Sequence, residues 1–500
     1  MIYDYPPSPQ ELLDALEAGV AVWGAASLGA LRAVELRPFG MKGVGWVYER
    51  YLNGDIESDD EVVVTLDGAG RQTSVALVCV RFGLDRLIER NAISKPVATA
   101  VVSALRDMHF SVRTRTAVID VAAAHVSSAA ARALASPRYD IKALDAAEAL
   151  KAFRLSALRP QPAPSAVSER RGSPVVTRVA DTTGLDRVGI ATASCICPGS
   201  GDGLTVYSGK GETLDAAKTS ARYECVERIA AVWDIERVCE TATQDLEAGG
   251  VLVLAPESFT EYHGEFTADT VLPWVRTETL ADRRECWVPA DRVFIGRRPS
   301  VVPGAAGSFT TTNGLAASND IGSAISHAIL ELAERHVISC VEIQAADHAW
   351  TVLGGMADRL GLDTGVLADR FREDEDAAAT VDPVTLPERA ARLYAKFALA
   401  GVPVVVKAVP NELGIPVYAA GALEQVSFDS FLAAAGYAAR FDPESAVVAA
   451  LLELAQSRAT DLQGAREDVD EVEKRRLLAP PRHNWLLTRI HELGSFSADR

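Results

Sequence analysis

"SARYECVER" (Ser220–Arg228) and "HAILELAER" (His327–Arg335) follow one template: alanine, two residues, glutamate, two residues, and then a Glu-Arg pair. "ALLELAQSR" (Ala450–Arg458) repeats the first part of the template and has Gln456 in place of the second glutamate. Because an α-helix turns once every 3.6 residues, residues four, seven and eight apart lie on one face. The template therefore predicts three helices, each with an acidic or polar stripe on one face and an apolar stripe behind it.

Two interpretations of the acidic stripes are open. In the first, Glu224 with Arg228 and Glu331 with Arg335 are ion pairs on solvated helices, and each pair adds only a few tenths of a kcal/mol. In the second, the helices converge, and their glutamates cannot all stay ionised without cations. Mg²⁺ binds carboxylate oxygens and completes its shell with water and phosphate oxygens, and arginine binds phosphate well. The repetition favours this second interpretation, a magnesium–nucleotide site without a Walker loop.

Small and polar loops precede the first two acidic helices. "YSGKGETLDAAKTS" (207–220) places Lys210 between two glycines, where backbone N–H groups can approach a phosphate closely. A Gly-Lys-Gly sequence alone indicates only a turn, but its place ahead of an acidic helix makes Lys210 a candidate phosphate contact. "GSFTTTNGLAASND" (307–320) is also predicted to be a loop, and it leads directly into the second acidic helix.

The composition is that of an ordinary globular protein. The 500 residues are 48% hydrophobic and 24% charged, which allows two or three domains with sizeable cores. A net charge of −18 argues against a nucleic-acid-binding protein, which would carry a basic stripe. The beginning, "MIYDYPPSPQ", does not resemble a signal peptide, no apolar run has membrane-spanning length, and the seven scattered cysteines lack zinc-site spacing. We therefore expect a cytoplasmic protein that binds neither nucleic acid nor membrane.

The segment "RPQPAPSAVSERRGSP" (159–174) is rich in proline, serine and charge and has no periodicity, so it is the predicted linker. It separates a first domain (1–158) from a second (175–500). Apolar runs typical of strands alternate with helical patterns in both, which predicts an α/β fold. The predicted strands are 19–25, 60–66 and 116–126 before the linker and 286–295, 400–410 and 414–423 after it, with a helix at 27–36 and a solvated connection at 372–389.

After the linker, the sequence resembles the YcaO family. The resemblance lies in "TRVADTTGLDRVGI" (177–190), in the two acidic templates with "SGKG" and "TTNGLAAS", and in "FDPESAVVAALLELAQSRATDLQGARED" (441–468). It implies an α/β domain in which three related acidic helices surround a nucleotide site, and an enzyme that activates backbone amides of peptides with ATP and Mg²⁺. The expected metal ligands are Glu224, Glu227, Glu331 and Glu334, and the expected nucleotide contacts are Lys210, Ser220, Arg228, Asn319, Arg335, Gln456 and Arg458.

One position departs from the family pattern. The family usually has a glutamate ahead of the second acidic template, where "SNDIGSAISHA" (318–328) has Ser323. We expect Asn319 or Asp320 to take over the corresponding nucleotide contact.

Before the linker, "VWGAASLGALRAVEL" (22–36) and "FGMKGVGWVYERYLNGDIESDDEV" (39–62) resemble the TfuA family. TfuA proteins accompany those YcaO enzymes that make thioamides rather than azoline rings, so the resemblance implies a TfuA-like α/β domain fused to a YcaO domain. Ser27 follows a predicted strand and opens a predicted helix. Capping that helix is its expected role, but a helix N-terminus also binds anions, and Arg32 lies one turn inside. The tail of a sulfur-carrier protein is such an anion, so Ser27 and Arg32 are also candidate docking residues for it.

The predicted function is ATP- and Mg²⁺-dependent formation of a thioamide on a backbone amide of a ribosomally made peptide or protein. No catalytic side chain is expected, because the binding residues position ATP and the substrate. The expected partners are a precursor peptide or protein and a sulfur donor or sulfur-carrier protein, and a homodimer is left open. Two alternatives remain: an azoline-forming cyclodehydratase of the same family, and a non-catalytic scaffold that binds peptide and carrier.

Overall fold

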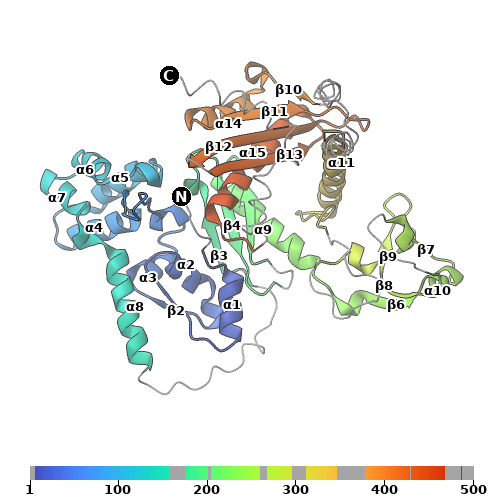
Figure 1. Cartoon of the computed structure of the whole chain (residues 1–500), viewed down its shortest axis with the longest axis horizontal. Coiled ribbons are helices and arrows are strands. Elements are labelled where there is room, and N and C mark those ends of the chain that lie inside the picture. The colour runs from blue at the N-terminus through green and yellow to red at the C-terminus, as the bar shows by residue number, and fades with distance from the viewer. Residues whose placement is uncertain are drawn as a thin grey trace, which may run out of the picture.

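The structure is a computed structural model that describes residues 6–157, 175–200, 204–259, 267–295, 311–345, 378–427, 430–467 and 486 (Figure 1). Its apolar side chains form several buried clusters, and every cluster within these ranges draws its residues either from before position 158 or from after position 174. Each half of the chain therefore has cores of its own. The predicted linker lies outside the described residues, and the predicted domain boundaries stay predictions.

The first half is mostly helical and lies to the left in Figure 1. Two short parallel strands, β1 (Trp23–Ala25) and β2 (Lys42–Val44), form its sheet within the described residues. Within the described residues this half has eight α-helices: α1 (Pro9–Glu17), α2 (Leu28–Glu35), α3 (Trp46–Leu52), α4 (Leu77–Glu89), α5 (Lys95–Arg106), α6 (Arg115–Ala123), α7 (Ser128–Leu134) and α8 (Ile141–Ala157). Of these, α2, α3 and α8 pack against the two strands.

Two strands predicted for this half are wrong. Residues 59–62 form a 3₁₀-helix, and residues 115–123 form α6. The helix α6 begins where the Thr114 side chain accepts a hydrogen bond from the Ala117 N–H at 3.2 Å. This cap and the alanine-rich sequence favour a helix over the strand that the valines and isoleucine indicate.

Two of the sheets in the second half share one helix. The antiparallel sheet β3 (Arg178–Asp181), β4 (Thr192–Ile196) and β5 (Val206–Lys210) has α9 (Leu214–Ala230) on one face. The antiparallel sheet β10 (Ala379–Thr380), β11 (Val404–Ala408), β12 (Val417–Ser427) and β13 (Ser430–Ala439) has α14 (Glu388–Leu399) and α15 (Pro443–Gln463) on one face and α11 (Ile321–Ala345) on the other. The predicted strands at 400–410 and 414–423 are confirmed as β11 and β12.

The helix α15 reaches from one sheet to the other (Figure 1). Its apolar residues, such as Leu451 and Leu454, pack on β12 and β13. Farther along, Thr460 bonds through its hydroxyl to the Ser208 hydroxyl of β5 at 3.0 Å, and Gln463 accepts a bond from Ser194 of β4 at 3.0 Å. One helix therefore fixes the two sheets relative to each other.

Glycines allow α9 and α15 to lie directly against their strands. A Cβ atom on Gly209 of β5 would lie 2.2 Å from the Ala217 carbonyl oxygen of α9, and a Cβ on Gly436 of β13 would lie 2.3 Å from the Ala450 carbonyl oxygen of α15. Gly211, on the other side of Lys210, also faces α9 closely. The sequence analysis explained the glycines around Lys210 by the close approach of a phosphate. The structure explains them by the close packing of α9 against β5.

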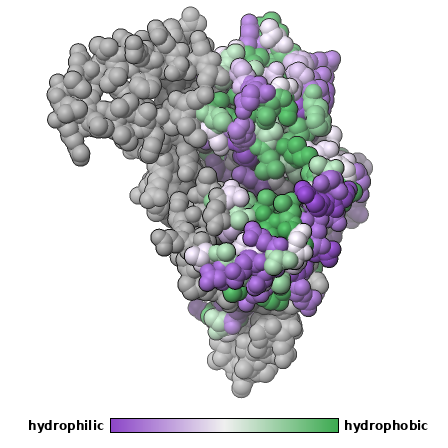
Figure 2. Space-filling model, turned by 90° about the vertical axis from the view of Figure 1, so that its right-hand side faces the viewer, coloured by the Kyte–Doolittle hydropathy of each residue, from purple (hydrophilic) through white to green (hydrophobic). Residues whose placement is uncertain are grey.

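A small sheet lies apart from the other two, at the lower right of Figure 1. It has the order β6 (Val238–Ala242), β8 (Val271–Glu278), β9 (Glu285–Pro289) and β7 (Leu252–Val253), with α10 (Thr243–Ala248) between β6 and β7 in sequence. Figure 2 views the molecule from this side, where hydrophobic residues interrupt a hydrophilic surface.

Within the described ranges, no helix is both long enough and apolar enough to cross a lipid bilayer.

Charged side chains join the two halves. Arg178 of β3 binds Glu35 of α2 at 2.8 Å and Asp59 at 2.7 Å, and all three side chains are buried or nearly so. Gln463 at the end of α15 donates to the second oxygen of Asp59 at 3.0 Å. The backbone N–H of Asp181 also bonds to the Glu57 carbonyl at 3.2 Å. The contact between the halves is therefore polar and fixed by buried ion pairs.

Candidate functional site

The acidic faces of α9, α11 and α15 meet. Lys210, which ends β5 ahead of α9, pairs with Glu453 of α15 at 2.5 Å. The charge of Glu331 on α11 acts on Glu227 of α9, and that of Glu453 acts on Arg335 of α11. Charges on three separate solvated helices would not interact in this way, so the arrangement supports the interpretation in which the helices converge.

The helix α9 contributes Glu224 and Glu227. Burial raises the pKa of Glu224, although Arg466, 3.4 Å away, and Arg228 act in the opposite direction. Burial and the nearby charges of Glu331 and Glu224 raise the pKa of Glu227 to about 8. Near neutral pH, Glu227 is therefore mostly protonated until a bound cation balances the negative charges of Glu331 and Glu224.

The helix α11 contributes Glu331 and Glu334. Burial raises the pKa of Glu331, which accepts a hydrogen bond from the Gly314 N–H at 3.3 Å. Burial and the charge of Glu453 raise the pKa of Glu334 to about 7. Glu334 accepts a bond from the Ala439 N–H of β13 at 3.3 Å, so one of its oxygens is oriented by the sheet.

The helix α15 contributes Glu453, which was not among the predicted ligands. Burial alone would raise its pKa, but Lys210 and Arg335 outweigh burial and lower it, so Glu453 is ionised. It also accepts from the Tyr437 N–H at 3.3 Å. The signal for this residue was present in the sequence, because Glu453 occupies the first glutamate position of the repeated template.

These side chains fit Mg²⁺ and a nucleotide. The four predicted metal ligands all have raised pKa values, which indicates a site that needs positive charge. Within the part of the chain that the structure describes, no three acidic, histidine or cysteine side chains are placed to hold one ion together. Each Mg²⁺ would take one or two carboxylates and fill its shell with water and phosphate oxygens, as this ion prefers. The Nε of Arg335 is buried without a hydrogen-bond partner, and a phosphate oxygen would satisfy it.

Two predicted nucleotide contacts on α15 are bound within the protein. Gln456 donates to the Ser208 carbonyl at 3.2 Å. Arg458 is fully buried and binds Asp186 at 2.8 and 3.1 Å and Glu424 at 2.9 Å. Moving this guanidinium to a phosphate would leave the two buried carboxylates without their partner, which is strongly unfavourable. The assignment of Arg458 to the nucleotide is therefore corrected to a structural role.

The remaining predicted contacts lie near the cluster. Ser220 lies on α9 one turn before Glu224, and its role stays a prediction. Asn319 accepts a hydrogen bond from Tyr223 of α9, which holds it beside that helix. Asp320 accepts from the Ser323 N–H at 2.9 Å and from its hydroxyl at 2.6 Å at the start of α11. Asp320 thus binds Ser323, and Asn319 is the better placed of the two substitutes.

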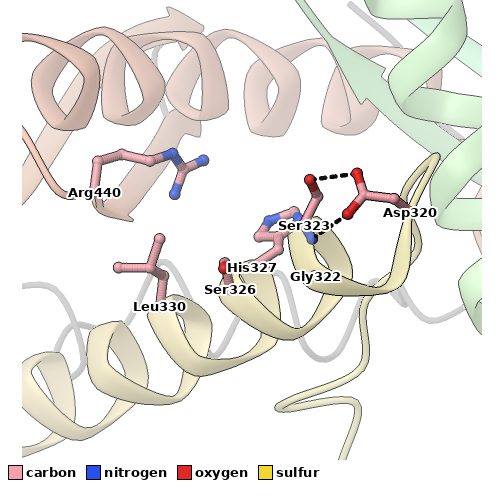
Figure 3. Close-up of a pocket in the computed structure, with 7 residues that line it drawn as sticks. All are labelled: Asp320, Gly322, Ser323, Ser326, His327, Leu330 and Arg440. Carbon is pink, nitrogen blue, oxygen red and sulfur yellow. Dashed lines mark hydrogen bonds between the residues drawn. The ribbon is translucent and has the colours of Figure 1, made fainter.

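A pocket of about 530 Å³ opens beside the first turns of α11 (Figure 3). In Figure 3, Arg440 approaches it from the end of β13, opposite His327 and Ser326 of α11. Partial burial and the positive charges of Arg440 and Lys210 lower the pKa of His327, so its ring is neutral near pH 7. The lining residues are Asp320, Gly322, Ser323, Ser326, His327, Leu330 and Arg440.

The predicted docking site in the first half is not supported. Ser27 precedes α2, but its side chain caps no N–H group and instead donates to the Val62 carbonyl at 3.3 Å. Arg32 is 3% exposed and binds Glu35 at 2.6 Å. A buried arginine paired with an acid presents no charge to a carrier tail, so both expectations are corrected. Lys142, which the sequence did not single out, donates to the same Val62 carbonyl at 2.8 Å.

Comparison with known families identifies both halves. The family model described as "YcaO cyclodehydratase", ATP- and Mg²⁺-binding, matches residues 208–496. The chain belongs to the YcaO family. The model described as "TfuA-like protein" matches residues 3–114, so one chain carries a TfuA-like N-terminal domain and a YcaO domain. YcaO proteins are ATP-dependent peptide-modifying enzymes, and the cofactors of the YcaO domain are ATP and Mg²⁺.

The chain is also similar to individual proteins. An uncharacterized protein of Methanothermobacter thermautotrophicus is 32% identical over 63% of this chain and 74% of its own length. An uncharacterized protein in the tfuA 3′ region of Rhizobium leguminosarum bv. trifolii is 24% identical over 59% of this chain and 64% of its own length. The solved structure of YcaO from Methanopyrus kandleri bound with AMPPCP and Mg²⁺ is 21% identical and has a TM-score of 0.39, with 66% of this chain and 72% of that chain covered.

Proposed function

We propose that this chain replaces the oxygen of a backbone amide with sulfur, at the expense of ATP, in a ribosomally made peptide or protein. The reaction would take place in the cytoplasm. The observation that carries the proposal is the convergence of carboxyl groups with raised pKa, such as Glu227 and Glu334, with Lys210 and Arg335 beside an open pocket.

Each group of residues has a role in this proposal. Bound ATP supplies the phosphoryl group that makes the amide oxygen a leaving group, with its phosphate charges balanced by Mg²⁺. The four glutamates of α9 and α11 hold the metal, and Lys210, Arg228 and Arg335 orient phosphate oxygens. In the net reaction the amide oxygen leaves within inorganic phosphate, ADP is the second product, and a sulfur atom from a hydrosulfide-type donor takes the place of the oxygen.

The pocket beside α11 suits the amide that reacts. Its Arg440 can donate to the carbonyl oxygen, and the hydroxyl of Ser326 lies on the same side of α11 as His327. The His327 ring is neutral near pH 7 because its pKa is lowered, so a ring nitrogen carries a lone pair that can accept the proton that sulfur loses as the thioamide forms. The substrate peptide would therefore lie across the first turns of α11.

The second candidate function is azoline formation, in which a Cys, Ser or Thr of the substrate attacks the preceding carbonyl. The description of the matching family as cyclodehydratases favours it. The TfuA-like domain favours thioamide formation, because TfuA proteins accompany the thioamide-forming members of the family. A non-catalytic scaffold is the third candidate, and it should not hydrolyse ATP.

Co-expression of the chain with a peptide encoded by a neighbouring gene tests the proposal by mass spectrometry of the peptide. A mass gain equal to the exchange of oxygen for sulfur supports thioamide formation, whereas loss of one water shows azoline formation. The matched pair of variants is Glu227→Gln, which should abolish the modification, and Glu240→Gln, an exposed glutamate on β6 that should have no effect. An unmodified peptide together with no Mg²⁺-dependent ATP hydrolysis would overturn the enzymatic proposal in favour of the scaffold.

A further inference from the structure

The end of α15 contacts the TfuA-like half. Gln463 is the last residue of the helix, and Gly464, with φ of 58°, ends it in the left-handed conformation. The Gln463 amide donates to Asp59 of the first half at 3.0 Å and accepts from Ser194 of β4 at 3.0 Å. Asp59 is itself held by Arg178 at 2.7 Å. Both ends of the Gln463 side chain are therefore fixed.

Four residues later the chain makes a second contact with the first half. Glu467 accepts hydrogen bonds from the Thr205 N–H at 3.1 Å and from the Thr205 hydroxyl at 2.5 Å. It also accepts from the backbone N–H of Gln10, in the first turn of α1, at 3.4 Å. A single carboxylate thus joins the first helix of the TfuA-like half to the beginning of β5.

Between these two contacts lies Arg466, whose guanidinium is 3.4 Å from the Glu224 carboxylate of α9. The preceding residue, Ala465, is buried with Ala180, Ile196 and Val206 against the β3–β5 sheet. Because Ala465 is enclosed and Gln463 and Glu467 are both bound, the backbone at Arg466 is held on both sides. These contacts help to place its guanidinium beside Glu224.

We propose that Gln463 and Glu467 are positioning residues through which the TfuA-like half holds Arg466 against Glu224, and so set the affinity of the YcaO site for Mg²⁺ and nucleotide. The inference rests on the proposed function, in which Glu224 is a metal ligand. Groups that orient a metal ligand matter for affinity, and loss of such a partner costs about 10–100-fold in metal binding. By thermodynamic linkage, binding of Mg²⁺ and nucleotide at the site and formation of the contact between the two halves then favour each other.

Calorimetric titration of the full chain with Mg²⁺ and a non-hydrolysable ATP analogue tests this inference. Gln463→Ala and Glu467→Ala should each weaken binding by about 10–100-fold, in the same direction as Arg466→Met. Glu467→Gln, which keeps one acceptor oxygen, should recover part of the affinity. The control is Arg106→Gln, which removes another ion pair between the halves, to Asp181 at 3.6 Å, and should bind like the wild type.

The decisive measurement is the double variant Gln463→Ala/Arg466→Met. If Gln463 acts through Arg466, this variant binds no more weakly than Arg466→Met alone, whereas a separate structural role makes the two losses add. Wild-type affinity in Gln463→Ala and Glu467→Ala, or additive losses, would overturn the inference. Glu224→Gln separates this outcome from failure of the site itself, because unchanged binding in that variant contradicts the assignment of Glu224 as a ligand.

Discussion

Replacing Glu227 with glutamine should make the metal-free protein more stable while it abolishes binding of Mg²⁺ and ATP. Burial and the charges of Glu331 and Glu224 raise the pKa of Glu227 from 4.5 to about 8. In the unfolded chain this carboxyl ionises near its usual pKa, so ionisation favours unfolding in the interval between the two values. Glutamine resembles the protonated form and has no such cost.

The magnitude follows from the shift. Because the folded pKa is raised, the contribution of Glu227 to the free energy of unfolding is fully present below its unfolded pKa and is lost as the pH rises to about 8. One pKa unit corresponds to about 1.4 kcal/mol, so at about pH 7 the variant should gain up to about 3 kcal/mol over the wild type. Since the side chain is only partly buried, this value is an upper bound, and the gain should shrink to about 1 kcal/mol near pH 5.

Denaturant unfolding with a chelator present, at several pH values between about 5 and 8, measures the difference. Glu240→Gln is the control, because Glu240 is exposed and its variant should match the wild type at every pH. Addition of Mg²⁺ and an ATP analogue should stabilise the wild type and leave Glu227→Gln unchanged, since only the wild type binds them. A variant that is less stable than the wild type without metal would refute the reasoning, because Glu227 would then be a structural ion-pair partner.

Three further predictions concern residues whose roles the structure redefined. Arg458→Met should cost about 3–5 kcal/mol of stability, because Asp186 and Glu424 lose their buried partner, and calorimetry should still find wild-type nucleotide affinity in the folded protein. Ser27→Ala should cost less than about 1 kcal/mol in denaturant unfolding, since the hydroxyl makes one long bond and caps no helix; a larger loss would restore the capping role. Gly209→Ala should displace α9 and weaken Mg²⁺ binding in the same titration, and unchanged binding would show that the helix position does not matter.

The repeated template was enough to predict the acidic helices α9 and α11 and the glutamates on their converging faces, whose binding of metal stays a prediction. The spacing of Glu224 and Glu227 is a local property, and a helix of 3.6 residues per turn fixes their common face. The template could not show that Lys210 neutralises Glu453, because their pairing joins residues 243 positions apart. The same limit applies to Arg458, whose partner Asp186 is 272 positions away.

Two predictions for the first half, the strand at 116–126 and the helix cap at Ser27, failed because the local sequence is compatible with more than one backbone structure. The apolar run at 116–126 contains residues that favour strands, yet Thr114 caps a helix there. Ser27 stands where a capping residue belongs, but its φ and ψ of −138° and −127° differ from the extended values of a usual N-cap. The preceding Ala26 has φ of 70°, so the backbone turns in a way that the sequence pattern does not indicate.

The polar contact between the halves has a consequence for how the protein is made. The first half encloses its own apolar residues, and the surface that later receives Arg178 displays the carboxylates of Glu35 and Asp59. Before the second half is synthesised and folded, this surface exposes charged rather than apolar side chains, so the partly made chain has little tendency to aggregate. The same surface would serve two separately translated polypeptides, and joining them in one chain raises the effective concentration of each half for the other.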